Sequence, residues 1–467
     1  MKKEIITPNT KNIFFIVVAL LVLLIFYLIP TPEGLTYAGK MMIGILFMAA
    51  ILWITEPIPL AVTGLLIMII QPLLYVREAT AVFSSFGNQA VFFLIGAFII
   101  AGAVEKHGLH RRIALKFLSL FEKSPRLFTF GIMISCASLS FIMPEHGVAA
   151  LFLPIVVSIL IAMKIVPKKS NFGKVCMLSV AYGCSIGSLG TLIGGARNPL
   201  TVGLLAEQGI SITFFDWMKY SIPIVVITLP LVWLVLQLSF PIEIKDISVA
   251  KLEIKKQVTA AGRISKNEII VLSILIFTIF LWILFSSNTY YGLAVIAILG
   301  SFLLFVTRSI TWKDVEGRVP WGIILLYGGA ITLGMGMQKT NAGVWLANQI
   351  FTAFNVNPYA VILVMIILTI LLTNIMSNIG AVAILLPIAL SIAPKIGVDP
   401  RLTSLIVALS GGLAFMLVIA TPGNAITYSS GYYSTKDLFK AGVSANIICI
   451  AIIFVVAVIY WMGILGL

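Results

Sequence analysis

The 467 residues are 60% hydrophobic and 10% charged, whereas about 25% of the residues of an average soluble domain are charged. This composition excludes a soluble globular protein and predicts an integral membrane protein. A formal net charge of +14 would suit nucleic-acid binding, but most of the 31 Lys and Arg residues gather in alternate connections between apolar runs. That distribution is the positive-inside pattern of membrane proteins. It predicts a cytoplasmic N-terminus and no nucleic-acid partner.

Hydropathy along the chain predicts an all-α, multi-pass protein of the plasma membrane with about eleven transmembrane helices. The predicted spans lie near residues 13–30, 39–54, 59–75, 89–105, 173–193, 221–239, 267–286, 289–307, 320–338, 402–419 and 442–465. This odd number of crossings places the C-terminus outside the cell. The four cysteines lie in apolar segments without metal or disulfide spacing. We therefore expect neither a metal nor a cofactor.

Two apolar regions are interrupted by a short polar stretch near their middle. The first interruption, at 143–147, reads Met-Pro-Glu-His-Gly and separates apolar runs at 128–142 and 148–161. The second, at 376–380, reads Met-Ser-Asn-Ile-Gly and lies between two runs of similar length. These runs are shorter than the roughly 20 apolar residues of a spanning helix. Because irregular backbone at membrane depth is tolerated only inside protein or beside a water-filled cavity, we predict two re-entrant hairpins.

The interruptions occupy matching positions in the two halves of the chain. We expect four parts, namely an N-terminal first span at 1–38, a first repeat at 39–239, a cytoplasmic linker at 240–266 and a second repeat at 267–467. The expected hairpins lie at about 126–164 and 357–394, and the expected broken helices lie at about 173–207 and 402–431. Each repeat starts from the opposite side of the membrane, so the repeats are predicted to be inverted. Paired interruptions of this kind indicate the binding site of a transporter.

Glycine and proline are dense in the two predicted broken helices, at 183–199 and at 410–424. Such density interrupts a helix, and the new N-termini expose N–H groups whose partial positive charge suits a carboxylate. A pair of kinked helices with satisfied backbones is the alternative. Four interruptions in matched pairs favour a binding site.

Three segments resemble the divalent anion:sodium symporter family. They are Trp53-Ile54-Thr55-Glu56-Pro57-Ile58-Pro59, Ser377-Asn378 followed by Leu386-Pro387, and Ala420-Thr421-Pro422-Gly423-Asn424-Ala425. The resemblance covers nearly the whole chain and implies a homodimeric dicarboxylate carrier in lipid, whose transport domain moves like an elevator against a scaffold. In that family two Ser-Asn-Thr hairpin tips hold the substrate carboxylates and help to cage sodium ions.

The first half departs from this family pattern. It reads Pro-Glu-His at 144–146 instead of Ser-Asn-Thr, and Ala-Arg-Asn at 196–198 instead of Pro-Pro-Asn. The site thus loses neutral ligands and gains Arg197 and His146. An arginine is always charged and grips a carboxylate with two parallel hydrogen bonds, so these residues are expected to replace sodium. The alternatives are an Arg197 that reaches the interface or pairs structurally with a carboxylate, and a neutral core His146.

The predicted substrate-binding residues share a place at a hairpin tip or a broken helix, and they are His146, Arg197, Asn198, Ser377, Asn378, Thr421 and Asn424, with Glu145 as a charge partner. A fixed arginine cannot leave with the substrate, and its uncompensated charge is costly to move across a membrane. This predicts sodium-independent, obligatory exchange of C4–C5 dicarboxylates such as succinate, malate, fumarate or 2-oxoglutarate, resembling the exchanger branch of the family. The alternatives are a sodium-coupled symporter of the same substrates, a channel, and an intramembrane enzyme using Glu145 and His146.

Overall fold

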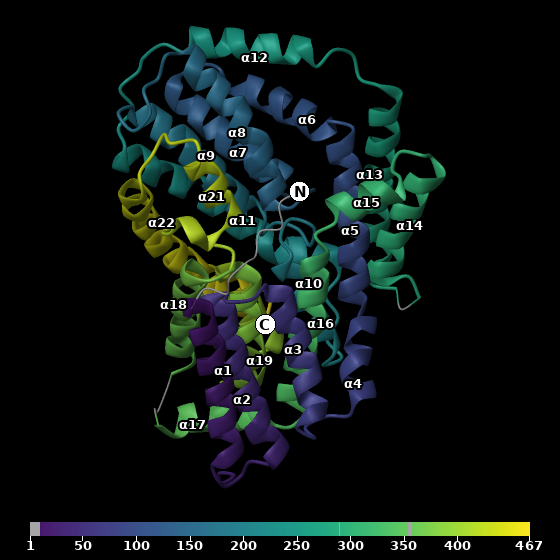
Figure 1. Cartoon of the computed structure of the whole chain (residues 1–467). Helices are drawn as coiled ribbons and strands as arrows, with labels where there is room; N and C mark the ends of the chain where they lie inside the picture. The colour runs from purple at the N-terminus through teal and green to yellow at the C-terminus, as the bar shows by residue number, and fades with distance from the viewer. Residues whose placement is uncertain (1–9, 289, 354–356) are drawn as a thin grey trace.

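The computed structural model describes residues 10–288, 290–353 and 357–467, and it contains α-helices, short 3-10 helices and one π-helical segment over these ranges (Figure 1). The first nine residues of the expected N-terminal segment and position 289 of the span expected at 289–307 lie outside the described residues. Ten helices of the described part are long and apolar enough to cross a membrane, by length and composition. They include three hairpin helices, whereas several other expected spans are shorter or broken. The all-α prediction is confirmed.

After α1 (Thr10–Leu28), the first half contains ten helices: α2 (Tyr37–Thr55), α3 (Leu60–Leu73), α4 (Ala79–Phe83), α5 (Gln89–Lys106), α6 (Leu109–Leu118), α7 (Pro125–Leu139), α8 (Glu145–Ala162), α9 (Asn171–Gly187), α10 (Arg197–Ala206) and α11 (Phe214–Ser239). The described part of the second half follows the same order: α13 (Lys266–Phe285), α14 (Gly292–Val306), α15 (Trp312–Arg318), α16 (Trp321–Lys339), α17 (Ala342–Ala353), α18 (Pro358–Ile375), α19 (Asn378–Ile392), α20 (Pro400–Ser410), α21 (Pro422–Tyr428) and α22 (Thr435–Val455), which continues into a π-helical segment (Val456–Ile464). The inverted relation of the two halves stays a prediction.

Corresponding helices of the two halves begin with the same local chemistry. The N-cap hydroxyl of Thr213 accepts from the backbone N–H of Asp216, whose carboxylate accepts from the backbone of Thr213, at the start of α11. Ser434 and Asp437 form the same capping box at the start of α22. A capping box satisfies two backbone donors that the helix itself leaves unpaired. These short motifs fix where each helix begins.

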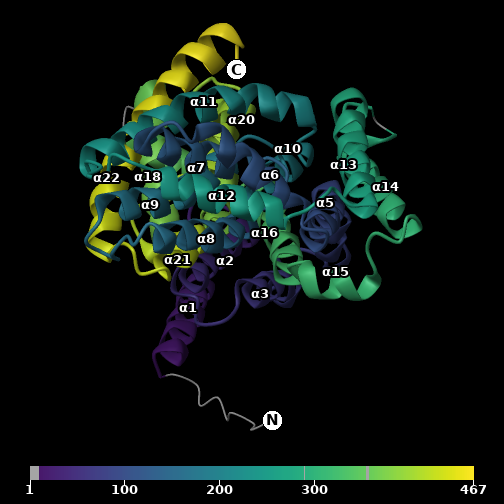
Figure 2. The same cartoon turned by 90° about the horizontal axis from the view of Figure 1, so that it is seen from above.

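Small residues allow close packing between helices of the two halves. A Cβ atom on Gly96 of α5 would lie 2.6 Å from the carbonyl carbon of Ala297 in α14, and one on Gly329 of α16 would lie 2.3 Å from the Cα of Gly64 in α3. Small residues let membrane helices approach backbone to backbone. In Figures 1 and 2, α5, α13 and α14 form one side of the molecule, and α7, α8, α9 and α21 lie together on the other.

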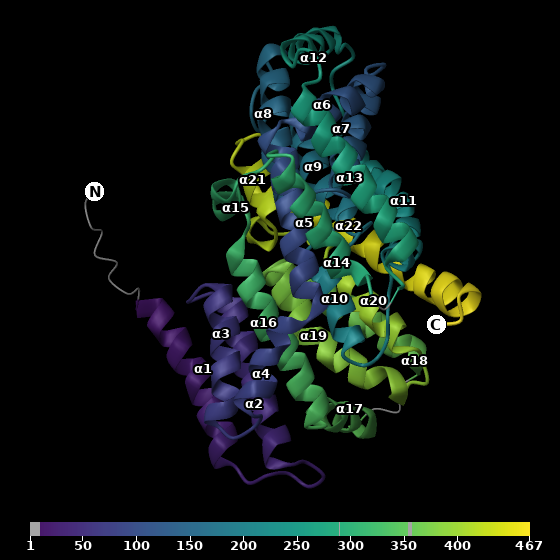
Figure 3. The ribbon, with the colours of Figure 1, turned by 90° about the vertical axis from the view of Figure 1, so that its right-hand side faces the viewer.

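The linker between the halves contains a helix that the sequence analysis does not anticipate, α12 (Ser248–Ala260). It buries Ala250, Ile254 and Gln257 and packs against α8 and α6. Figure 3 shows α12 at the opposite end of the molecule from α17. This end carries the basic connections that predict the cytoplasmic side.

Candidate functional site

Helices α7 and α8, and likewise α18 and α19, are joined by a short turn, and both predicted broken helices are interrupted. That the two hairpins are re-entrant stays a prediction. The α7–α8 hairpin turns at residues 140–144, and the α18–α19 hairpin turns at Met376 and Ser377. Helix α9 ends at Gly187 and α10 begins at Arg197, while α20 ends at Ser410 and α21 begins at Pro422. Both interruptions thus separate two helices with an unwound segment.

The N-terminal ends of α8, α10, α19 and α21 meet at one cavity of about 550 Å³. Its polar lining residues are Glu56, Glu145, His146, Arg197, Ser377, Asn378 and Thr421. Helix N-termini carry partial positive charge and unpaired N–H groups, which suit an anion. The cavity therefore combines neutral donors, an arginine and several helix N-termini.

The second hairpin tip presents two neutral polar side chains. The Ser377 hydroxyl oxygen caps α19 by accepting from the backbone N–H of Gly380 at 3.2 Å. The Oδ1 atom of Asn378 accepts from the Thr373 hydroxyl at 2.8 Å, and that hydroxyl also lies 2.7 Å from the carbonyl oxygen of Gly411. These contacts orient the tip, while the Ser377 hydroxyl hydrogen stays available to a ligand.

Glu145 is 9% exposed and contacts the second tip rather than Arg197. Its Oε1 atom accepts from Asn378 Nδ2 at 3.4 Å, and its Oε2 atom is buried without a hydrogen-bond partner in the part of the chain that the structure describes. No ion pair joins Glu145 to Arg197 across these residues. The two side chains line the same cavity without an ion pair, and the role of Glu145 as a charge partner stays a prediction.

Arg197 is 2% exposed and its guanidinium lies between the two unwound segments. Its Nε donates to the carbonyl of Ala408 at 3.2 Å, and its Nη2 donates to the Ser188 hydroxyl at 2.8 Å. A Cβ atom on Gly412 would lie 2.1 Å from Nη2, and one on Gly195 would lie 2.7 Å from Nη1. The side chain therefore points into the protein and away from a membrane interface, and glycines of both halves make room for it.

His146 lines the 550 Å³ cavity and also a second cavity of about 720 Å³. The second cavity is bordered by charged residues of α5 and of the segment containing α15, namely Glu105, Lys313, Asp314 and Arg318. Lys106 pairs with Asp314 at 2.7 Å. Hydrogen bonds from the Lys106 ammonium and from Thr311 hold the pKa of Asp314 well below its usual range. A charged vestibule thus adjoins the site at His146.

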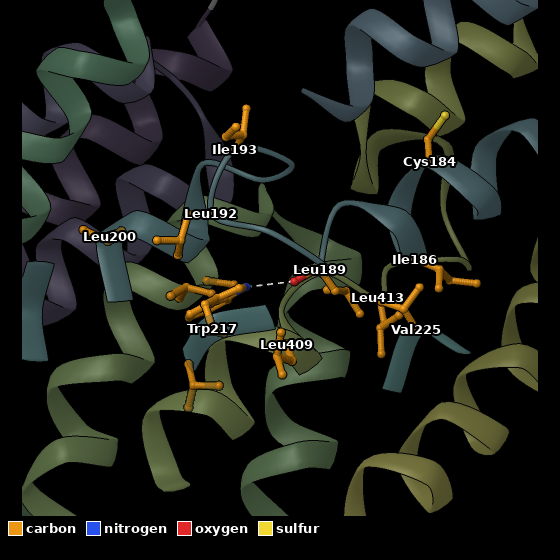
Figure 4. Close-up of a cluster of buried hydrophobic side chains, with 14 of the residues drawn as sticks. Cys184, Ile186, Leu189, Leu192, Ile193, Leu200, Trp217, Val225, Leu409 and Leu413 are labelled. Carbon is orange, nitrogen blue, oxygen red and sulfur yellow. Dashed lines mark hydrogen bonds between the residues drawn. The ribbon is translucent and has the colours of Figure 1, made fainter. Parts of the chain in front are cut away.

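Side chains pair with several backbone carbonyls in and beside the unwound segment of the first half. Trp217 Nε1 donates to the carbonyl of Leu189 at 2.9 Å, as Figure 4 shows among the surrounding leucines. The Ser221 hydroxyl donates to the carbonyl of Gly190 at 3.1 Å, and the Thr191 hydroxyl donates to the carbonyl of Phe141. An unpaired buried carbonyl costs free energy comparable to a lost hydrogen bond. These side chains therefore keep the segment unwound at low cost.

Asn198 and Asn424 do not line the cavity, and their predicted contact with the substrate stays a prediction. Asn198 Nδ2 donates to the carbonyls of Ser188 and Thr191 at 2.8 and 2.7 Å. Asn424 Nδ2 donates to the carbonyls of Ala414 and Leu417, both at 3.0 Å. Both side chains are fully buried. Each asparagine closes the unwound segment that precedes its own helix.

The cavity is also lined by Glu56, which the sequence does not predict as a site residue. It belongs to the family-like segment at 53–59. It follows α2 with a φ of 44° and lies on the helix break between α2 and α3. The five predicted substrate-binding residues that line the cavity are His146, Arg197, Ser377, Asn378 and Thr421, and the predicted charge partner Glu145 lines it too.

Comparison with known proteins agrees with this architecture. The family model described as "Sodium:sulfate symporter transmembrane region" matches residues 10–467. The sodium-dependent dicarboxylate transporter SdcS of Staphylococcus saprophyticus is 29% identical over 99% of this chain and 93% of its own length. SdcS of Staphylococcus aureus strain USA300 is 31% identical over 95% of this chain and 89% of its own.

Two solved structures share the fold at low sequence identity. Neisseria gonorrhoeae MtrF has a TM-score of 0.57 and 13% identity and covers 98% of this chain and 96% of its own. The Alcanivorax borkumensis YdaH transporter has a TM-score of 0.56 and 11% identity and covers 82% of this chain and 87% of its own. The resemblance to the exchanger branch stays a prediction. The chain belongs to the sodium:sulfate symporter family, also called the divalent anion:sodium symporter family.

Proposed function

We propose that this protein carries C4–C5 dicarboxylates across the plasma membrane and binds them in the 550 Å³ cavity between the hairpin tips. The observation that carries the proposal is the buried guanidinium of Arg197 at this cavity, which makes no ion pair among the described residues. A buried cation without a carboxylate partner is costly, and an anionic substrate offsets that cost. The printed names of the SdcS relatives support a dicarboxylate as this anion.

The arrangement of donors suits a substrate with two carboxylates. Arg197 and the N-terminus of α10 would hold one carboxylate, and Ser377, Asn378 and the N-terminus of α19 would hold the other. A volume of about 550 Å³ lies within the roughly 300–1,000 Å³ of small-molecule sites. Thr421 and His146 border the same space. Neutral hydroxyl and amide donors at one end would complement the fixed charge at the other.

The proposed coupling is obligatory exchange. An empty carrier would have to move Arg197 without an anion, and an uncompensated charge at membrane depth costs several kcal/mol or more. In a loaded carrier one substrate carboxylate pairs with the guanidinium, and the Ser377 and Asn378 side chains and the helix N-termini stabilise the second carboxylate, so the barrier is lower. We propose that the carrier moves loaded in both directions, by an elevator motion of the hairpins, and works as a homodimer.

Sodium-coupled symport is a second candidate, and a specific arrangement favours it. The Thr373 hydroxyl, Asn378 Oδ1 and the Gly411 carbonyl oxygen lie close together in the second half, with the hydroxyl 2.8 and 2.7 Å from the other two. Clustered oxygens of this kind suit hard cations. The relatives are named sodium-dependent transporters. In this version, sodium accompanies the substrate in the second half and Arg197 replaces sodium in the first.

Labelled succinate uptake into proteoliposomes separates these candidates. In sodium-free buffer, exchange predicts uptake only when the lumen contains unlabelled dicarboxylate. Uptake into empty vesicles that needs a sodium gradient would instead establish symport. Chromatography of the label recovered from the vesicles identifies its chemical form. A carrier would deliver unchanged succinate, whereas an intramembrane enzyme would deliver a product. Failure of uptake in every condition would contradict succinate transport itself.

A further inference from the structure

The two unwound segments are closed by asparagines with the same spacing. Asn198 donates to carbonyls ten and seven residues before it, and Asn424 donates to carbonyls ten and seven residues before it. Both side chains are fully buried, and both lie outside the cavity. One amide that pairs two carbonyls holds the ends of an irregular segment at a fixed separation. The shared role is therefore structural closure of a helix break.

In the first half, this closure is linked to the charged group at the cavity. The carbonyl of Ser188 accepts from Asn198, and the hydroxyl of the same serine accepts from Arg197 Nη2 at 2.8 Å. That hydroxyl donates its own hydrogen to the carbonyl of Ser185 at 2.7 Å. Ser188 is thus held at its backbone by Asn198 and receives the guanidinium with its side chain.

The second half has the same closure without an arginine. Ala414, which occupies the place of Ser188 in the spacing, has no hydroxyl, and its carbonyl accepts from Asn424. The backbone N–H of Asn424 donates to the Thr421 hydroxyl oxygen, which caps α21. Asn424 can therefore serve as an internal control. It makes the same two hydrogen bonds to its unwound segment as Asn198 does, but the residue it holds does not contact a guanidinium.

The guanidinium has little freedom to adjust if Ser188 moves. Gly412 and Gly195 approach it so closely that a Cβ atom on either would lie within 3 Å of a guanidinium nitrogen. A binding group must be held within about 0.5 Å of its productive position to act efficiently. If the Ser188 hydroxyl moved, the guanidinium of Arg197 would lose the acceptor that fixes the position of Nη2.

We propose that Asn198 is a positioning residue that sets the orientation of Arg197 toward the substrate carboxylate, acting through Ser188. Asn424 closes its own segment without this second role. The inference rests on the proposed function, because it assigns Arg197 to the substrate. In this way an asparagine next to the arginine would act on the site although it does not line the cavity.

Double-mutant cycles test this coupling. Succinate affinity is measured for purified full-length protein by succinate-induced thermal stabilisation, which needs no transport. The variants are Asn198→Ala, Arg197→Lys, Asn424→Ala and the two doubles that contain Arg197→Lys. Lysine keeps the charge but lacks the planar fork that Ser188 orients. We expect Asn198→Ala to weaken binding about tenfold in the parent and less than about twofold in the Arg197→Lys background.

Asn424→Ala is the control for this double-mutant cycle, and the results that would overturn the inference differ from those that would contradict the proposed function. Asn424→Ala is expected to change affinity by the same factor in both backgrounds. If Asn198→Ala weakens succinate binding by the same factor in the parent and in the Arg197→Lys background, Asn198 only maintains the fold, and the inference is overturned. If Asn198→Ala does not fold, Ser188→Ala removes the hydroxyl acceptor alone, and parental affinity in that variant overturns the inference equally. Parental protein that succinate does not stabilise would instead contradict the proposed function.

Discussion

At the scale of single residues, Arg197 is the group on which the proposed substrate binding depends. Its guanidinium is buried, donates to Ala408 and Ser188, and makes no ion pair in the described part of the chain. Arg197→Gln removes the charge that attracts the anion, and we expect succinate exchange to fall about 30-fold or more. Arg126→Gln removes one charge from an exposed position of α7 and is the matched control. Parental exchange rates in Arg197→Gln would refute the assignment.

The glycine beside this arginine gives a second prediction at this scale. In Gly412→Ala the new methyl group would fall 2.1 Å from Nη2 and 2.5 Å from Leu189 Cδ2. Overpacking of this kind costs about 1–3 kcal/mol and displaces the guanidinium. We expect a lower Tm together with weaker succinate binding. Gly317→Ala, where no atom lies within 4 Å of the new Cβ, is expected to leave both quantities unchanged.

The sequence predicts which residues lie near the helix breaks better than it predicts where their side chains point. Spacing placed Arg197, Asn378 and Thr421 at the interruptions, and these residues line the cavity. It placed Asn198 and Asn424 there too, but their amides pair with carbonyls of the preceding segments. The conformation of an unwound segment decides this orientation, and no hydrophobic period describes such a segment.

At the scale of elements, α12 is a helix that the hydropathy of the linker does not predict. Its buried face, at Ala250, Ile254 and Gln257, includes a small and a polar side chain, while Leu252 and Val258 are exposed, so its amphipathic pattern is weak. Its position depends instead on particular polar contacts. Gln257 Nε2 donates to the Ser158 hydroxyl of α8 at 2.6 Å. Such contacts depend on the tertiary structure and leave no local signal in the linker.

Arg112 of α6 fixes the turn between α12 and α13. It pairs with Glu268 at 2.9 Å and donates to the carbonyls of Ala261, Gly262 and Arg263. In Arg112→Gln these hydrogen bonds are lost, and the cost is about 1–3 kcal/mol for the partly buried carboxylate. We expect a lower Tm and faster tryptic cleavage at the exposed lysines of α12. Arg111→Gln is the neighbouring control. Equal cleavage rates for the parent and both variants would contradict the role of Arg112 in fixing this turn.

At the scale of the whole molecule, the order of helices in the second half repeats that of the first. Hydropathy predicted most of these helices, because long apolar runs are independent of tertiary context. The lengths of several spans differ from the prediction, since Gly187 and Ser410 end helices that hydropathy alone would extend. The breaks are therefore visible in composition, but their boundaries require the structure.

An elevator motion predicts that α10 separates from α5 during transport. In this structure Asn88 Nδ2 at the start of α5 donates to Glu207 at 2.7 Å and to the carbonyl of Gly203 at 3.3 Å, which holds the two helices together. A thiol cross-link between Asn88→Cys and Glu207→Cys is expected to stop exchange, and reduction or single-cysteine variants are expected to restore it. The native cysteines of the described chain are buried. Undiminished exchange by the cross-linked protein would exclude a separation of these helices.

The contacts of Arg197 also bear on how the protein is made. The arginine belongs to the first half, yet the carbonyl of Ala408 and the space beside Gly412 come from the second half. During synthesis, more than two hundred residues separate the insertion of the arginine from the arrival of its acceptor. A truncated chain that ends at the linker would hold this charge in the membrane without those partners. The surroundings of the arginine are therefore completed only when the second half is inserted, and a prematurely terminated product would carry a buried charge that lacks this acceptor.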